Sequence, residues 1–548
     1  MKSRLVLIVA AVVAAAVTST FGAVKPHCTF TDNAVLQRGV PLPVTGTADE
    51  GEEVTVVFQK QKVSTTAKGG HWKVMLKPLD AGGPFEMTIG TVTLKNILVG
   101  DVWICSGQSN MGFGLNGAHD AEQVIPKANH PKIHLYKVPN VTSFEPQASC
   151  DGKWTECTPE TAKGFTAVGY YFGRDIHAAT GVPLGLINTS WGGTPAQAWT
   201  SLQGLESEPS LDGFVNNYKT TIANIDKLEE KYQTEIFPKW KKETDAATAK
   251  WKVETAAAKK DGQPAPPPPK LPHKPNSPKS NPGTPSVLYN AMIHPLLSFP
   301  IKGAIWYQGE ANAGNPMQYR VLFPTMIKDW RRAWNCGEFP FLFVQLANYM
   351  KRETEPTQTD GGWPGLREAQ AMTLKLANTG QAVAIDVGEG DDIHPKNKAE
   401  VGKRLALAGL KIAYDKDIVF SGPTYDSMKV DGDKIRLRFK NVGGGLVIGA
   451  APIIRLGQEP NKPLDHLVGF SIAGADKKFV WANAKINGDS VIVSCDAVKN
   501  PVAVRYAWAN NPECNLYNKK GIAASPFRTD DWTTAAPEPQ QPKKGNRK

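Results

Sequence analysis

Between about residues 98 and 412, short apolar runs alternate with longer amphipathic stretches, and this alternation constrains the fold more than any other feature of the sequence. The runs include DVWICSG, PLGLINTSWGG, IKGAIWYQG, FPFLFVQLA and GQAVAIDVG. Continuous apolar runs of this length are typical of strands buried on both faces. Stretches such as AVGYYFGRDIHAAT and KAEVGKRLALAGLKIAYD, which lie between them, have the length of helices. The alternation predicts an α/β fold with a parallel sheet covered by helices on both faces.

The pattern of apolar and polar residues changes on both sides of this region. Residues 24–97 alternate apolar and polar positions between glycine and proline turns, which predicts a β-sandwich or jelly-roll element. Short β segments return between 413 and 535, where we expect a second β-rich domain. Because a chain of 548 residues is too long for one hydrophobic core, a division into several domains is expected.

One insertion interrupts the predicted α/β domain at about 218–283. It begins with a stretch rich in Lys, Glu and Ala and continues with PAPPPPKLPHKPNSPKSNPG. We interpret it as a charged helix followed by a polyproline-like linker, solvated on the surface. Contact of this insertion with a partner or with the cell envelope is the alternative.

The first 23 residues have the pattern of a secretory signal peptide. A positive start is followed by the apolar run LVLIVAAVVAAAV and by small residues. An uncleaved membrane anchor is the alternative, although the run is short for a bilayer span. We therefore expect a secreted or periplasmic protein with no membrane span in the mature chain.

The formal net charge of +11 first invites a nucleic-acid partner. Much of the excess lies in the insertion and in a predicted basic tail at 536–548, and no nucleic-acid motif accompanies it. We therefore expect no nucleic-acid partner.

The seven cysteines are too few for a disulfide scaffold and do not have metal-ligand spacing. Cys150 and Cys157 are close enough in sequence to pair in an oxidising compartment.

Polar residues follow several of the apolar runs directly, at the edge of a parallel sheet where ligands bind. In CSGQSNMG, Gly107 permits a tight turn and Ser109 follows it as a possible nucleophile, although serines after strands are also common turn formers and helix caps. In NTSWGGTPAQAW, Gly192 and Gly193 can bring backbone N–H groups to a ligand, or can simply form a turn. The third run, IWYQGEANAGN, ends in three polar side chains that can donate to an oxyanion or hold the loop: Gln308, Glu310 and Asn312.

The segment DVGEGDDIHPKNK supplies a possible base. His394 follows acidic residues, and histidine is the usual general base near neutral pH. Asp391 lies three residues before it and can fix its tautomer, while Asp392 is the alternative because loop geometry decides which carboxylate reaches the ring. Glu310 with either aspartate also allows a two-carboxylate glycosidase as a second hypothesis.

Taken together, GDVWICSGQSNM, SWGGTPAQAW, GAIWYQGEANA and DDIHPKNKAEVGKRLAL resemble the blocks of the sialate O-acetylesterase family within the SGNH (GDSL-like) hydrolases. The resemblance extends from about residue 24 to 532, except for the insertion. It implies an SGNH-type, flavodoxin-like three-layer sandwich with a parallel sheet, flanked by β-sandwich or jelly-roll elements.

The resemblance also implies roles for the residues of these blocks. Ser109 is the expected nucleophile and His394 the base, oriented by Asp391 with Asp392 as the alternative acid. The expected oxyanion donors are the Ser109 N–H, an N–H of Gly192 or Gly193, and the side-chain amide of Gln308. Four neighbouring side chains are expected to support the loops: Gln108, Asn110, Glu310 and Asn312.

The activity implied by this resemblance is removal of O-acetyl groups from sugars, with sialic acid as the expected substrate, through an acyl-enzyme on serine. Neither a metal nor an organic cofactor is expected, and the partner is an O-acetylated carbohydrate. An acetylated polysaccharide such as xylan is the alternative substrate. A catalytically inactive glycan-binding protein is the alternative of a different class.

Overall fold

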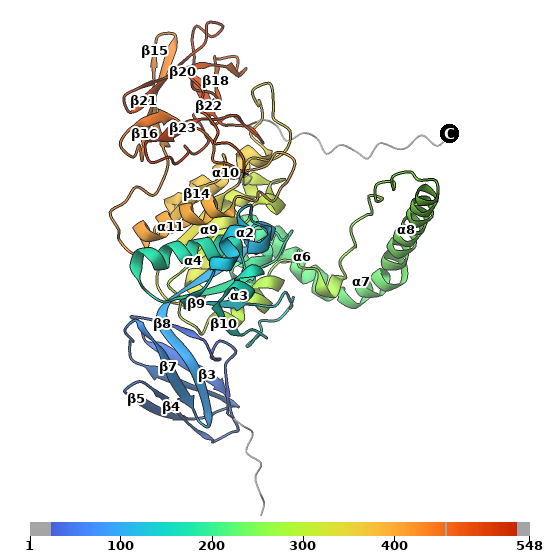
Figure 1. Cartoon of the computed structure of the whole chain (residues 1–548), viewed down its shortest axis with the longest axis vertical. Coiled ribbons are helices and arrows are strands. Elements are labelled where there is room, and N and C mark those ends of the chain that lie inside the picture. Colours follow the sequence, from blue (N-terminus) through green and yellow to red (C-terminus); the bar gives the residue numbers. More distant parts are fainter. Residues whose placement is uncertain (1–23, 455–456, 534–548) are drawn as a thin grey trace, which may run out of the picture.

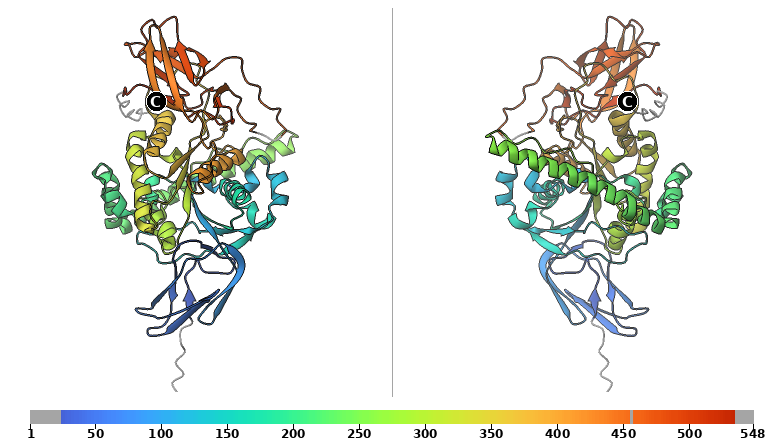
Figure 2. Two further views of the ribbon diagram at one scale, coloured as in Figure 1. Left: turned by 90° about the vertical axis from the view of Figure 1, so that its left-hand side faces the viewer. Right: turned by 90° about the vertical axis from the view of Figure 1, so that its right-hand side faces the viewer.

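The computed structural model describes residues 24–454 and 457–533 (Figure 1). A β-rich N-terminal part, a central α/β part and a β-rich C-terminal part follow one another along the long axis of the molecule (Figures 1 and 2). The predicted signal peptide at 1–23 and the predicted tail at 536–548 lie outside the described residues. Within the described ranges, no helix has both the length and the apolar character needed to cross a membrane.

The central sheet confirms the predicted parallel α/β core. Its strands lie in the order β10-β9-β11-β8-β12-β13-β14, and each neighbouring pair is parallel except β10 with β9 at the edge. Five of these strands contain the apolar runs predicted from the sequence, and β9 and β10 were not predicted. The bounds are β8 (Val92–Gly107), β9 (His130–Lys137), β10 (Trp154–Cys157), β11 (Leu184–Ser190), β12 (Gly303–Tyr307), β13 (Phe341–Gln345) and β14 (Thr379–Val383).

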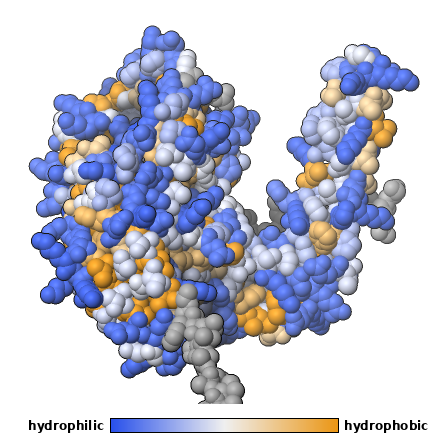
Figure 3. Space-filling model, turned by 60° about the horizontal axis from the view of Figure 1, so that its bottom comes forward, coloured by the Kyte–Doolittle hydropathy of each residue, from blue (hydrophilic) through white to orange (hydrophobic). Residues whose placement is uncertain are grey.

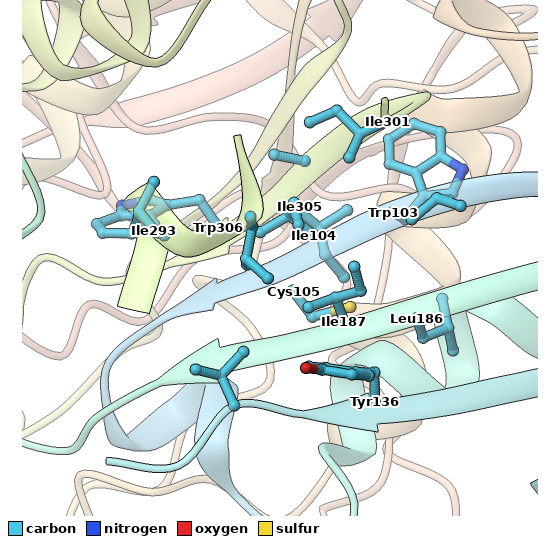
Figure 4. Packing of buried hydrophobic residues seen from close by; sticks show 14 of the residues in the cluster. Trp103, Ile104, Cys105, Tyr136, Leu186, Ile187, Ile293, Ile301, Ile305 and Trp306 are labelled. Carbon is cyan, nitrogen blue, oxygen red and sulfur yellow. The ribbon is translucent and has the colours of Figure 1, made fainter. Parts of the chain in front are cut away.

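Helices pack on both faces of this sheet. On one face, Trp103 of β8 contacts Phe172 of α4, with ring centroids 4.9 Å apart. Trp306 of β12 is three residues beyond the partner of Trp103 in the register, so it points to the opposite face, where it contacts Trp330 of α9. Figure 4 shows the buried side chains of these adjoining strands. The covering helices are α4 (Ala167–Thr180) with α11 (Lys398–Ile412), and α9 (Pro316–Trp334) with α10 (Gly362–Met372).

Strand β8 belongs to two parts of the molecule. Its first half pairs with β7 and β2 of the N-terminal β region, and its second half pairs with β11 and β12. The predicted boundary between residues 97 and 98 therefore falls inside a continuous strand. The remaining N-terminal strands are β1 (Lys25–Pro26), β2 (Val35–Gln37), β3 (Leu42–Thr47), β4 (Glu53–Phe58), β5 (Gln61–Thr66), β6 (His71–Leu76) and β7 (Gly82–Ile89).

The C-terminal part consists of short antiparallel sheets, in the orders β15-β16-β21-β20, β17-β23 and β19-β18-β22-β24. Its apolar cluster includes Val383 and Ile385 at the end of β14, so this part packs directly on the central sheet. The strands are β15 (Thr424–Asp431), β16 (Lys434–Lys440), β17 (Leu446–Ile448), β18 (Phe470–Ala473), β19 (Val480–Trp481), β20 (Asn483–Asn487), β21 (Ser490–Ser494), β22 (Ala503–Tyr506), β23 (Leu516–Asn518) and β24 (Phe527–Arg528).

The charged insertion forms an arm that projects from the core (Figures 1 and 3). It consists of α6 (Asp212–Ala223), α7 (Ile225–Lys231), a π-helical turn and α8 (Phe237–Lys260), followed by the proline-rich segment. This segment returns along α8, where the Trp240 and Trp251 indoles each donate a hydrogen bond of 2.9 Å, to the carbonyls of Pro272 and Pro266. No residue of α8 is buried, as expected for a solvated insertion.

The cysteine side chains do not form the Cys150–Cys157 pair suggested from the sequence. Cys157 is buried at the end of β10, and its thiol lies 3.8 Å from the Ala128 carbonyl. The sulfur of Cys150 instead lies 3.2 Å from that of Cys28 in the N-terminal β region. Cys150 and Cys157 are thus both free, because Cys157 lies within β10 whereas Cys150 lies against Cys28.

Candidate active site

Ser109 directly follows β8, the strand between β11 and β12. Gly107 has φ +135°, and a Cβ atom there would lie 2.1 Å from the Tyr307 carbonyl oxygen, so the approach of the two strands requires glycine. The Gln108 N–H then donates to the same carbonyl at 3.0 Å. The chain turns sharply at this point, and Ser109 begins the short helix α1 (Ser109–Gly112) at the carboxyl edge of the sheet.

His394 lies beside this serine. The distance between His394 Nε2 and Ser109 Oγ is 2.8 Å, although 285 positions separate the residues in sequence. His394 belongs to the loop between β14 and α11, which leaves the sheet at the same carboxyl edge as β8. A serine hydroxyl at this distance from an imidazole can transfer its proton to the ring nitrogen.

The carboxylate next to the His394 ring is that of Asp392. Its Oδ1 lies 3.6 Å from His394 Nδ1 and accepts a hydrogen bond of 2.9 Å from the His394 backbone N–H. Asp391 is exposed. The geometry thus favours the alternative acid over the one preferred from sequence, because the tight loop turns adjacent aspartates in different directions.

The surroundings of His394 favour its neutral form. Burial lowers the pKa of the imidazole below its ordinary 6.5, and the nearby charge of Lys398 lowers it further, while Asp392 acts in the opposite direction. A neutral imidazole is the form that accepts a proton. The site is therefore arranged for a general base that works around neutral pH.

Backbone N–H groups meet at the serine. A Cβ atom on Gly192 would lie 3.2 Å from Ser109 Cβ, so this glycine is packed against Ser109. In the part of the chain that the structure describes, neither the Ser109 N–H nor the Gly192 N–H has a hydrogen-bond acceptor. Gly193 is exposed with φ +75°. The first two N–H groups can therefore receive an oxyanion.

Gln308 does not fit the oxyanion role predicted for it. Its side chain is fully buried, and its Nε2 donates to the Thr194 carbonyl at 3.3 Å and to Asn312 Oδ1 at 2.7 Å. Its Oε1 accepts a hydrogen bond of 3.0 Å from the Tyr319 hydroxyl. With both amide hydrogens used, Gln308 holds the loop after β12 and offers no donor to a ligand.

The four predicted supporting residues connect the loops around the serine. Gln108 Oε1 accepts a hydrogen bond of 3.3 Å from the Ala311 N–H. Asn110 Nδ2 donates to Glu310 Oε1 at 2.6 Å, and Asn312 Oδ1 also accepts from the Ala196 N–H at 2.9 Å.

Lys398, which sequence reasoning missed, is fully buried and donates to Asn110 Oδ1. The only signal for it in the sequence was its place in the HPKNK block, four residues after His394.

A cavity of about 340 Å³ opens onto Ser109 and His394. Lys137, at the end of β9, contributes the one lysine or arginine of its lining, and no aspartate or glutamate lines it. Within the described residues the Lys137 ammonium makes no ion pair. The other lining residues are Gly112, Phe113, Val138, Asn140, Asn188, Ser190 and Gly192.

A family model described as "Carbohydrate esterase, sialic acid-specific acetylesterase" matches residues 99–248 and 280–411, which contain every residue of this site. The chain belongs to this family of carbohydrate esterases. Membership confirms the predicted class, a carboxylic ester hydrolase, and sets the glycosidase hypothesis aside. The part of the chain between the two matched stretches, 249–279, contains the second half of α8 and the proline-rich segment, so this part of the arm lies outside the family match.

Individual members of the sialic acid-specific acetylesterase family are similar over most of the chain. Sialate O-acetylesterase of Mus musculus is 30% identical over 529 residues, with 88% of each chain covered, and that of Homo sapiens is 28% identical over 530 residues, with 88% of this chain and 86% of the human protein covered. A solved carbohydrate acetylesterase from Xanthomonas citri is 36% identical, with a TM-score of 0.72 over 93% of this chain and 100% of that one. The similarity therefore includes the β-rich parts on both sides of the catalytic domain.

Proposed function

We propose that this esterase removes O-acetyl groups from an acidic sugar, namely sialic acid, through a covalent acetyl-enzyme on Ser109. The observation that carries the proposal is the 2.8 Å contact between Ser109 Oγ and His394 Nε2, in the cavity of a chain that belongs to a carbohydrate esterase family.

The chemistry follows from the positions of these atoms. As Ser109 Oγ attacks the acetyl carbonyl, its proton passes to His394 Nε2, and the oxyanion accepts hydrogen bonds from the Ser109 and Gly192 N–H groups. The ester bond breaks, and the sugar oxygen leaves with the proton of His394. Water then loses a proton to His394, attacks the acetyl-enzyme, and releases acetate while Oγ regains its proton. The Asp392 carboxylate stabilises the imidazolium formed in both halves.

Lys137 supports an acidic sugar as substrate. It is an unpaired cation in the lining of a cavity that has no fixed negative charge, and a sialic acid carboxylate is a matching anion. Acetylated xylan, a neutral polymer, is the alternative and does not use this charge. The mouse and human relatives are named for sialate.

We also propose that the protein acts outside the cytoplasm. The support is the signal-peptide pattern of residues 1–23, which lie outside the described residues. An acetylated glycan of the cell exterior would be accessible there.

The test is acetate release by the purified protein from O-acetyl sialic acid and from acetylated xylan. We expect release from the sialic acid derivative and none from the folded Ser109→Ala variant. Near wild-type release by Ser109→Ala would refute the serine mechanism, and a strong preference for xylan would refute the acidic substrate. Glycan binding without hydrolysis of any acetyl ester would instead identify an inactive binding protein.

The Lys137→Gln variant tests whether the enzyme recognises the negative charge of the substrate. It should lower kcat/KM for O-acetyl sialic acid by about two- to fivefold, as expected for the loss of one exposed ionic contact, and leave kcat/KM for a neutral acetyl ester unchanged.

A further inference from the structure

A buried polar cluster lies directly behind the nucleophile and has no place in the steps above. We call Asn110, Glu310 and Lys398 the Lys398 cluster. Lys398 Nζ donates to Asn110 Oδ1, and Asn110 Nδ2 donates to Glu310 Oε1 at 2.6 Å. Lys398 has no exposed surface, and Glu310 Oε2 is shielded from solvent without a hydrogen-bond partner. Burying such groups costs free energy, so we ask what function explains their presence behind Ser109.

The cluster joins the segments that carry the reacting groups. Asn110 is the residue after Ser109, and Glu310 lies in the turn after β12. Asn110 Nδ2 also donates to the Ile393 carbonyl at 3.0 Å, and Ile393 precedes His394. One side-chain amide thus connects the backbone beside the nucleophile to the backbone beside the base. A shift of this amide changes the distance between Ser109 Oγ and His394 Nε2.

Lys398 occupies a position that local preferences disfavour. It is the first residue of α11, where the helix dipole opposes a positive charge. The rings of Phe113 and Tyr307 lie 4.9 and 5.3 Å from its ammonium and supply compensating cation–π contacts. A lysine that helix preference and burial both disfavour is typical of a functional position.

The charged groups around Lys398 come from several segments. Glu310 faces it from the turn after β12, and Glu389, Asp392 and His394 face it from the loop before α11. Burial lowers the pKa of Lys398 to about 7 against the attraction of the three carboxylates, and burial raises the pKa of Glu310. Below pH 7 the ammonium is therefore mainly charged, in the pH range where His394 gains its proton.

We propose that Lys398 is a positioning residue that orients the Asn110 amide, and through it Ser109 and His394, and that its charge keeps the His394 imidazole unprotonated for catalysis. The inference rests on the proposed serine mechanism and deepens it. It predicts two separate effects of removing the charge. Proton transfer slows because the Asn110 amide loses its hydrogen bond from Lys398. The acid limb of the pH–activity profile moves because the His394 imidazole loses a nearby positive charge.

The experiment measures kcat/KM for acetate release and the rate of Ser109 labelling by a fluorophosphonate, both from pH 4.5 to 9, in the full-length protein. We compare the wild type with Lys398→Met, with Glu310→Gln, and with the double variant Glu310→Gln/Lys398→Met. Lys403→Met is the matched control, because Lys403 lies on the same helix with its side chain 58% exposed. Thermal unfolding of each variant shows whether it folds.

For Lys398→Met we expect kcat/KM to fall by about tenfold to hundredfold and the acid limb to move to higher pH. Glu310→Gln removes one of the carboxylates that favour the charged form of Lys398 but keeps the lysine itself, so it should move the limb less far than Lys398→Met does. The double variant should move the limb as far as the single Lys398→Met does. Lys403→Met should match the wild type in both respects.

The proposal is overturned if folded Lys398→Met keeps the wild-type limb or stays within twofold of wild-type kcat/KM. If Lys398→Met does not fold, the double variant decides, since it removes both buried charges. If neither Lys398→Met nor the double variant folds, the Lys398 cluster has only a structural role, and the proposal is also overturned.

The labelling rate separates this inference from the proposed function. Wild-type protein that reacts with the fluorophosphonate but releases no acetate would refute the substrate. Labelling that Lys398→Met does not change would refute the role of Lys398.

Discussion

Replacing Asp392 by Asn isolates the carboxylate that the structure places beside His394. Asparagine has the same shape and keeps an oxygen that can accept the His394 N–H bond, which spans 2.9 Å. The change therefore removes one negative charge 3.6 Å from His394 Nδ1. This charge has its largest effect when the imidazole carries a proton in the transition state.

The size of the effect follows from distance and exposure. At this separation, a unit charge pair is worth about 1 kcal/mol in water and about 4–5 kcal/mol at the effective dielectric constant of 20 used near protein surfaces. Because the side chains of His394 and Asp392 are 37% and 39% exposed, we expect the lower part of this range, about 1–3 kcal/mol. Such a loss corresponds to a decrease in kcat of roughly 5- to 150-fold.

The assay is steady-state acetate release at pH 7.5, with thermal unfolding as the folding control. Asp391→Asn is the matched control, because Asp391 is adjacent and exposed, and we expect its kcat to stay within about twofold of wild type. A folded Asp392→Asn variant with wild-type kcat, together with a tenfold loss in Asp391→Asn, would show that the acid preferred from sequence is the correct one and would refute the geometric argument.

Three further predictions concern the pH dependence, the strand contact and the arm. The acid limb of kcat/KM should lie below pH 6.5, because burial and Lys398 lower the pKa of His394 and only the neutral imidazole accepts a proton; a limb above 6.5 in a pH–rate profile would contradict this. Gly107→Ala should lower the free energy of unfolding by on the order of 3 kcal/mol or more, since its Cβ would lie 2.1 Å from the Tyr307 carbonyl oxygen. Denaturant unfolding measures this free energy, and a value equal to that of the wild type would show that the backbone shifts to relieve the contact. Replacing residues 237–272 with a short Gly-Ser linker should leave the melting temperature and acetate release of the remaining chain near wild type, because α8 buries no residue; a large drop in either would show that the arm supports the core.

The sequence alone determined the elements whose signal lies in consecutive residues. Runs buried on both faces are apolar throughout, so five strands of the central sheet could be located from composition and length. The positions of Ser109 and His394 followed from the rule that functional side chains gather at the carboxyl edge of a parallel sheet. Strands β9 and β10 were missed because their polar and charged residues break the apolar pattern.

Only the tertiary structure decided contacts that depend on the path of loops. Asp391 and Asp392 are adjacent and chemically alike, and the turn of the backbone selects Asp392. Gln308 has the right chemistry for an oxyanion donor, yet Asn312 and the Thr194 carbonyl use its hydrogens. Cys150 meets Cys28 rather than its near neighbour in sequence. Spacing along a chain limits what can meet, and the packing of distant segments selects which of the possible contacts form.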